Sequence, residues 1–227
     1  MEPVTFLNAV FRGKVAHRYG MDTAIDKMPT TERIYLSETG LAGDECAEKR
    51  FHGGTERALH QYPAEHYAYW REKYGIEKNW QAPGMGENLS TEGMTEDTVC
   101  LGDRYQWGEA IIEVSQPRSP CFKLNQRWNI EKFSVDMQDI SRCGWLYRVI
   151  QPGYVSVSDP LKLIAREPNT MTLREVCDIY FGDPLNRDAL LRLKAQSKLS
   201  QSWTRTLDKR LETNELENWN FRLLGHA

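Results

Sequence analysis

Residues 99–165 form a succession of short apolar runs, each ended by glycine, proline or aspartate. Within residues 109–116 apolar and polar side chains alternate, which is typical of a strand that turns one face to a core. Pro117 and Pro120 end this run, because proline lacks the N–H group that a sheet ladder requires. Many short strands with few helices predict a mainly β fold with some α, built on an antiparallel or barrel-like sheet.

Helices and further strands are expected on both sides of this run. Pro63 suits the first turn of a helix over residues 64–74, which Gly75 ends. Apolar side chains repeat every three or four residues over 130–140 and predict an amphipathic helix there. The other expected strands lie at residues 4–10, 33–36, 99–103, 104–107, 145–150, 154–157 and 161–165.

The composition changes after about residue 165, where helical patterns replace strands. Thr172 and Glu175 fit a capping box, in which each side chain bonds the backbone N–H of the other residue, and Gly182 should end that helix. A second helix is expected from Pro184 and a third from Ser200 or the residue after it. The chain is therefore predicted to divide into a β domain and a small three-helix bundle.

The predicted β domain covers residues 1–165 and the three-helix domain residues 166–227. The second part carries 10 basic and 9 acidic residues, which disfavours DNA binding by its helices. It either packs on the first domain or presents a surface to a partner. The whole chain of 227 residues has 29 Lys and Arg against 32 Asp and Glu, so no direct nucleic-acid partner is expected.

Cysteine spacing and the lack of long apolar runs limit the cellular compartment and the kind of metal site to be expected. No stretch approaches the roughly 18 apolar residues of a membrane span, and no basic region precedes the first apolar run, so neither a membrane anchor nor a secretory signal is expected. The five cysteines lie far apart along the chain, which excludes zinc-type pairs. We expect free thiols in a reducing cytoplasm.

One cysteine has a setting suited to chemistry. Cys121 follows two prolines and lies between Arg118 and Lys123 in the sequence. Nearby cations favour the thiolate, which is the form that attacks substrates or binds metals. The alternative, a small buried hydrophobic residue, is the commoner fate of a free cysteine, and the two interpretations are about equally supported here.

Two glycine-containing segments suggest ligand contacts. Lys49, His52 and Arg57 surround a double glycine, and adjacent glycines let backbone N–H groups approach an anion such as phosphate. An ordinary tight turn is the alternative. In the segment 84–90, Asn88 can both donate and accept and so suits the edge of a heterocycle, with an Asx-type turn as the alternative.

These segments occur in an order that resembles a known family. The shared motifs are Gly43-Asp44, His52-Gly53-Gly54, Gly86-Glu87-Asn88-Leu89, Gly102-Asp103 and Pro117-Arg118-Ser119-Pro120-Cys121. They resemble the MOSC domain, named after the C-terminal part of molybdenum-cofactor sulfurases, over residues 30–165. The helical tail is similar to the three-helix extension of the YiiM-type bacterial branch. The resemblance implies a MOSC-type β-barrel domain followed by a three-helix bundle.

The resemblance also implies a molybdenum–molybdopterin cofactor whose metal takes one protein thiolate, at the position of Cys121. A metal held by a dithiolene needs only one further soft ligand, which agrees with the absence of paired cysteines. From chemistry and motif position, the expected cofactor-binding residues are Lys49, His52, Gly53, Arg57, Asn88 and Arg118. The candidates for proton relay are Asp44, Glu87 and Asp103.

The YiiM-type branch implies reduction of small N-hydroxylated compounds such as 6-N-hydroxylaminopurine. The sequence has no Gly-x-Gly-x-x-Gly fingerprint, so electrons should come from a separate NADPH-dependent flavoprotein. A homodimer is compatible with the sequence. The alternatives are a cofactor-binding or sulfur-carrier protein with a persulfide on Cys121, and a metal-free thiol enzyme using His52 or His60 as base.

Overall fold

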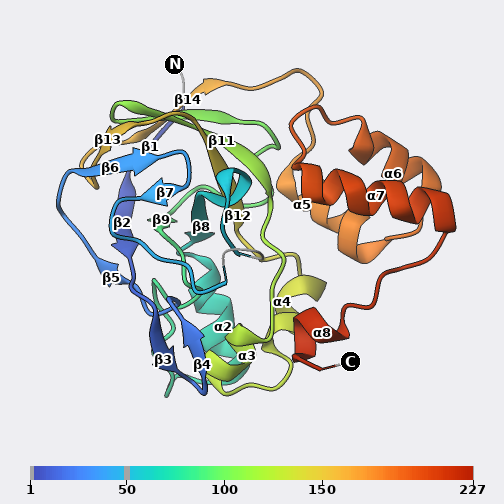
Figure 1. Cartoon of the computed structure of the whole chain (residues 1–227), viewed down its shortest axis with the longest axis horizontal. Coiled ribbons are helices and arrows are strands. Elements are labelled where there is room, and N and C mark those ends of the chain that lie inside the picture. Colours follow the sequence, from blue (N-terminus) through green and yellow to red (C-terminus); the bar gives the residue numbers. More distant parts are fainter. Residues whose placement is uncertain (1–2, 49–51, 227) are drawn as a thin grey trace.

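The computed structural model describes residues 3–48 and 52–226, and over these residues the main element is a nine-stranded mixed sheet (Figure 1). The order from edge to edge is β1-β14-β10-β11-β12-β8-β9-β2-β5, in which β8 and β9 run parallel and the other neighbours antiparallel. Its strands are Val4–Thr5 (β1), Leu7–Arg12 (β2), Met28–Pro29 (β5), Leu59–Pro63 (β8), Leu89–Thr91 (β9), Arg104–Trp107 (β10), Ala110–Pro117 (β11), Trp145–Gln151 (β12) and Leu161–Ala165 (β14).

Shorter strands surround this sheet. A smaller sheet joins β13 (Gly153–Val155), β6 (Ile34–Ser37) and β7 (Gly40–Leu41). A separate hairpin joins β3 (Ala16–Arg18) to β4 (Met21–Thr23). Its two-residue turn has positive φ at both positions, which matches the twist of a tight hairpin.

The central strand β11 is buried on both faces. Ala110, Ile112 and Val114 enter the sheet core, as their alternation predicts. Glu113, on the other face, is also buried and pairs with Arg104 at 2.6 Å and Arg148 at 2.7 Å. The sequence predicted a half-exposed strand here, but the helical region covers this face.

Helices close the sheet at its lower end in Figure 1. These are α2 (His66–Tyr74), α3 (Lys123–Trp128) and α4 (Phe133–Asp139), whereas the short 3-10 turn η1 (Thr55–Arg57) lies higher in the picture, against β12. An aromatic core holds them together, in which the rings of Trp80 and Trp128 stack with centroids 3.9 Å apart. Aromatic side chains bury large areas, so these short helices are stabilised by packing rather than by their length.

Four C-terminal elements pack around their own apolar cluster beside the sheet (Figure 1). They are α5 (Leu173–Cys177), the π-helical turns η2 (Asp178–Gly182), α6 (Arg187–Lys194) and α7 (Gln201–Thr213), and the short helix α8 (Asn220–Leu224) follows them. The capping box of Thr172 and Glu175 is present, and the first helix ends at Gly182, although its last turns are π-helical. α8 lies apart from the others, against α4.

Several element predictions need correction. Pro63 ends strand β8, and helix α2 begins later, at His66. Residues 99–103 form no strand, since Cys100 makes an isolated bridge with Thr172. The helix expected over 130–140 covers only Phe133–Asp139.

The C-terminal region also departs from its prediction. The second helix begins at Arg187 with Asn186 as its cap, because the Asn186 side chain accepts from the N–H of Ala189. Strands β8 and β9, the β3–β4 hairpin and helices α3 and α8 were not predicted. The mainly β fold with helices and a helical C-terminal region is confirmed, and the division at residue 165 stays a prediction. In the described ranges, no helix combines the length and apolar character needed to cross a bilayer.

Candidate functional site

Cys121 lies in the turn that connects β11 to α3. Cys121 is 7% exposed, and its backbone carbonyl accepts a hydrogen bond from the N–H of Leu124 at 3.0 Å. The N–H of Arg118 donates to the carbonyl of Gly144 at 2.9 Å, which ties the loop to the segment before β12. The prolines at the end of β11 and in the turn after it thus restrict the backbone before Cys121, whose side chain has a fixed and almost fully buried position.

Arg118 lies three residues before this thiol, and its guanidinium is available for a ligand. Its Nη1 contacts the Met137 sulfur at 3.7 Å, and among the described residues no carboxylate lies within ion-pair distance of it. Its charge acts on His52, His60 and Glu87, so these four residues belong to one electrostatic environment. An arginine without a partner is a suitable anchor for phosphate.

His52 is kept neutral at physiological pH. Burial, followed by the charges of Arg118 and Lys123, lowers the pKa of His52 to about 4. Its side chain is still 41% exposed, so the ring lies at the edge of the site rather than inside it. Lys123 itself is paired, with its Nζ 3.1 Å from Glu48 Oε2. A neutral His52 can both donate and accept a hydrogen bond.

The double glycine forms the turn that leads into η1. Gly54 has φ 99° and ψ 170°, a conformation that is essentially restricted to glycine. Arg57, at the end of η1, donates from Nη2 to Ser202 Oγ at 3.1 Å and thereby contacts α7. Gly53 precedes this turn, whereas Lys49 lies outside the described residues.

Asn88 is buried and bonded to protein atoms at both ends of its amide. Nδ2 donates to Asp44 Oδ2 at 2.8 Å and to the Phe11 carbonyl at 3.2 Å, and Oδ1 accepts from the N–H of His60 at 3.1 Å. Asp44 is in turn 2.5 Å from Lys27 Nζ. The observed role of Asn88 is to join β2, β8 and the loop of Asp44, and its contact with a pterin edge stays a prediction.

The three candidate carboxylates have different surroundings. Asp103 is fully buried and paired with Arg166 at 2.6 Å, and Asp44 is paired with Lys27. Glu87 has no ion-pair partner among residues 3–48 and 52–226, and burial raises the pKa of Glu87 to about 7. Its carboxylate accepts from Tyr67 and from the N–H of Met85. Glu87 is therefore the candidate best suited to hold or release a proton near neutral pH.

His60 is part of the site, although the sequence suggested it only as a base for a thiol enzyme. It is 8% exposed, and its Nε2 has no hydrogen-bond partner among the described residues. Burial, followed by the charge of Arg118, lowers the pKa of His60 well below its usual value. Buried polar atoms are normally satisfied, and Nε2 of His60 is therefore a candidate to bond a ligand.

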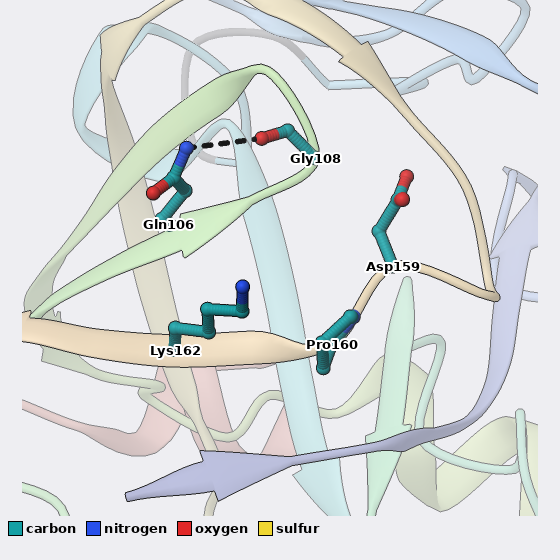
Figure 2. A pocket seen from close by; sticks show the side chains of 5 residues that line it. All are labelled: Gln106, Gly108, Asp159, Pro160 and Lys162. Atoms are coloured by element: carbon teal, nitrogen blue, oxygen red, sulfur yellow. Dashed lines mark hydrogen bonds between the residues drawn. The ribbon is translucent and has the colours of Figure 1, made fainter. Parts of the chain in front are cut away.

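Two surface cavities are lined by none of the predicted site residues. One of about 150 Å³ is lined by Gln106, Gly108, Asp159, Pro160 and Lys162 and holds none of the predicted site residues (Figure 2). A wider hollow of about 400 Å³ lies between α3 and α8 and begins at Phe122, next to Cys121. Across the described residues, no three His, Cys, Asp or Glu side chains gather to hold a metal ion by themselves.

Comparison with known proteins agrees with this arrangement. The MOSC domain matches residues 48–162, and the YiiM-like, 3-alpha helix domain matches residues 171–214. Protein YiiM of Escherichia coli is 45% identical over 218 residues, which cover 95% of this chain and 97% of that protein. The crystal structure of E. coli YiiM superposes with a TM-score of 0.85 and 40% identity, over 98% of this chain and all of that one.

A fungal protein named reductase, from Gibberella moniliformis, is 40% identical over 146 residues. These residues make up 63% of this chain but 26% of the fungal protein, so the two share a domain rather than a whole architecture. Both domain matches and the near-complete match to YiiM lead to one conclusion. This chain belongs to the MOSC-domain family, in the YiiM-like branch that carries a C-terminal three-helix domain.

Proposed function

We propose that the protein binds a molybdenum–molybdopterin cofactor and reduces small N-hydroxylated compounds such as 6-N-hydroxylaminopurine. Membership in the MOSC family and the relative named reductase support an oxidoreductase role. The observation that carries the proposal is the environment of Arg118. Among the described residues, Arg118 has no carboxylate partner and the buried His60 has an Nε2 without a hydrogen bond. The thiol of Cys121 lies three residues after Arg118 and is almost fully buried.

This donor set fits the cofactor. The phosphate of the cofactor needs a cation, which Arg118 offers, and its pterin edge needs donors and acceptors, which His52 and His60 offer. One soft ligand completes the metal coordination, and Cys121 is the thiol at that position. Gly53 and Arg57 lie on the turn beside them, and Lys49 completes the predicted set from outside the described residues.

The bound cofactor would supply a two-electron couple for cleavage of an N–O bond. The overall conversion consumes two electrons and two protons and yields the amine and water. In this chain, Cys121 would hold the metal and Arg118 would balance the charge of the cofactor phosphate. Glu87 holds a proton at its carboxylate, since its pKa of about 7 lets both protonation states coexist at neutral pH.

The electrons are proposed to come from a separate NADPH-dependent flavoprotein, and the setting to be a reducing cytoplasm. All five cysteines are free thiols. A protein partner could recognise the excess of acidic residues before residue 166, because complementary charge speeds the encounter of two proteins.

The test joins metal analysis to an assay. Protein from a molybdate-replete host is analysed for molybdenum and assayed on 6-N-hydroxylaminopurine with NADPH and a flavoprotein reductase. We expect near-stoichiometric molybdenum and turnover, both lost in Cys121→Ser, while Cys46→Ser retains them as the matched control. Metal-free protein with a persulfide on Cys121 and no turnover would reject the reductase and favour the sulfur carrier. Thiol-dependent catalysis without molybdenum would reject both.

A further inference from the structure

Helix α8 returns from the C-terminal region to the loop that holds Cys121. We propose that Arg222, on α8, is a positioning residue that fixes the Cys121 loop through the carbonyl of Pro120. This inference deepens the proposed function, on which the role of Cys121 rests, and it assigns to the C-terminal region a direct part in the site.

The main evidence is a set of hydrogen bonds on both sides of the cysteine. Arg222 Nη1 donates to the Pro120 carbonyl at 2.6 Å, and the N–H of Phe122 donates to the Arg222 carbonyl at 2.8 Å. The residues immediately before and after Cys121 are thus both bonded to Arg222. The other guanidinium nitrogen, Nη2, donates to Gln138 Oε1 at 2.7 Å, so the loop is also tied to α4.

α8 has its own anchors, which keep Arg222 in place. The carbonyl of Leu223 accepts from Asn125 Nδ2 at 2.8 Å and from Ser134 Oγ at 2.7 Å. Asn125 also accepts from the N–H of Ser134 at 2.7 Å, which joins α3 to α4 at this point. A five-residue helix is not stable alone, so these contacts determine its position.

The Arg222 guanidinium is half-buried between the two parts of the chain. It lies 5.7 Å from the Trp219 ring centre and 5.8 Å from that of Phe181, which places aromatic faces of the C-terminal region around the charge. The side chains of Cys121 and Cys143 are close enough to Arg222 to interact with its charge. A planar cation with two fixed acceptors holds a loop more rigidly than a flexible lysine would.

The test measures how fast Cys121 is alkylated by iodoacetamide in the full chain, purified from a host that makes no molybdenum cofactor. Mass spectrometry follows Cys121 and, as an internal monitor of folding, the fully buried Cys177. We expect about tenfold faster alkylation of Cys121 in Arg222→Gln, because bonds to a charged group are lost and the loop opens more often. Arg222→Lys, which keeps the charge and one bond, should be intermediate.

Arg174→Gln is the matched control. Arg174 also comes from the C-terminal region and also donates to a carbonyl of the first part, that of Ile140 at 2.7 Å, but it does not touch the Cys121 loop. Its substitution should leave the Cys121 rate unchanged. Equal Cys121 rates in the wild type and Arg222→Gln would overturn the proposal, as would an equal acceleration in Arg174→Gln.

A second variant distinguishes a local effect on the Cys121 loop from a general loosening of the fold. If Cys121 and Cys177 accelerate together in Arg222→Gln, Ser134→Ala decides, because it removes one anchor of α8 without removing the charge. Acceleration at Cys121 alone in Ser134→Ala supports the proposal, and no acceleration overturns it. Because the alkylation measurement needs no metal, it can succeed where the proposed function fails. Faster alkylation in Arg222→Gln, together with a wild type that contains no molybdenum when made in a molybdate-replete host, would reject the proposed function and keep the positioning role.

Discussion

The hydroxyl of Tyr67 donates to Oε1 of Glu87 over 2.6 Å, in a position where both side chains are buried. This bond lowers the pKa of Glu87, but burial raises it more, and the pKa settles at about 7. A carboxyl group of this kind couples the stability of the protein to pH.

Glu87→Gln should remove a pH-dependent part of the stability. The pKa of Glu87 is higher in the folded than in the unfolded chain, so the folded wild type keeps a proton that the unfolded chain releases. The free energy of unfolding of the wild type should therefore fall by about 3 kcal/mol as pH rises from about 4.5 to 7. Urea unfolding at both pH values measures this loss, which Glu87→Gln should not show. Glu92→Gln, at an exposed position, should behave like the wild type, and parallel curves for Glu87→Gln and wild type would contradict the assignment.

The buried pair of His66 and Glu96 should contribute strongly to stability. His66 Nε2 lies 2.6 Å from Glu96 Oε2, and Glu96 Oε1 accepts from the N–H of Gly144 at 2.7 Å. Glu96→Ala leaves both groups without a partner and should cost about 3–5 kcal/mol in the free energy of unfolding. Its neighbour Asp97 is 62% exposed, so Asp97→Ala should cost less than about 1 kcal/mol. Similar losses in the two variants would show that the buried pair is not special.

Gly54→Ala tests the backbone of the turn before η1. Among the described residues, a Cβ at this position meets no atom within 4 Å, so the expected loss of about 1–3 kcal/mol comes from the backbone conformation alone. Gly182 has equally open surroundings and no positive φ, and Gly182→Ala should change the thermal midpoint little. A neutral Gly54→Ala would mean that the turn adopts another conformation in solution.

Removing the charge of Arg118 should raise the pKa of His52. The charge of Arg118 is the first electrostatic cause of the low value of about 4, so Arg118→Met should move the pKa upward, toward its ordinary range. Titration of the imidazole signals by NMR measures this shift without any cofactor. Arg192→Met, exposed on α6, should leave it unchanged. An unchanged pKa of His52 in Arg118→Met would show that the two side chains are too far apart to interact electrostatically.

Local patterns predicted the elements that depend on local forces. The bounds of β10 and β14 and the capping box of Thr172 followed from alternation and from side-chain chemistry within a few residues. β8 was missed because it is buried throughout. Its polar Gln61 is satisfied by Thr91, Met94 and Tyr147, which lie far away in the sequence.

The site shows the same division. The motifs predicted Cys121, Arg118 and His52 as members of one site, because each belongs to a short stretch with its own chemistry, and this grouping stays a prediction. Two other features depend on the folded chain and have no local sequence signal. Among the described residues, Nε2 of His60 has no hydrogen bond, and the side-chain amide of Asn88 donates to Asp44. α8 was missed because its stability comes from side chains of α3 and α4.

The bond between Arg222 and Pro120 closes a loop of 102 residues. Contacts of such long sequence separation form late, since the intervening chain must first be ordered. During synthesis the β region can fold before α8 has emerged, so the two hydrogen bonds beside Cys121 form only after residue 222 has been made. Until α8 docks, Pro120 and Phe122 lack these bonds, and the loop between them is held only by its other contacts.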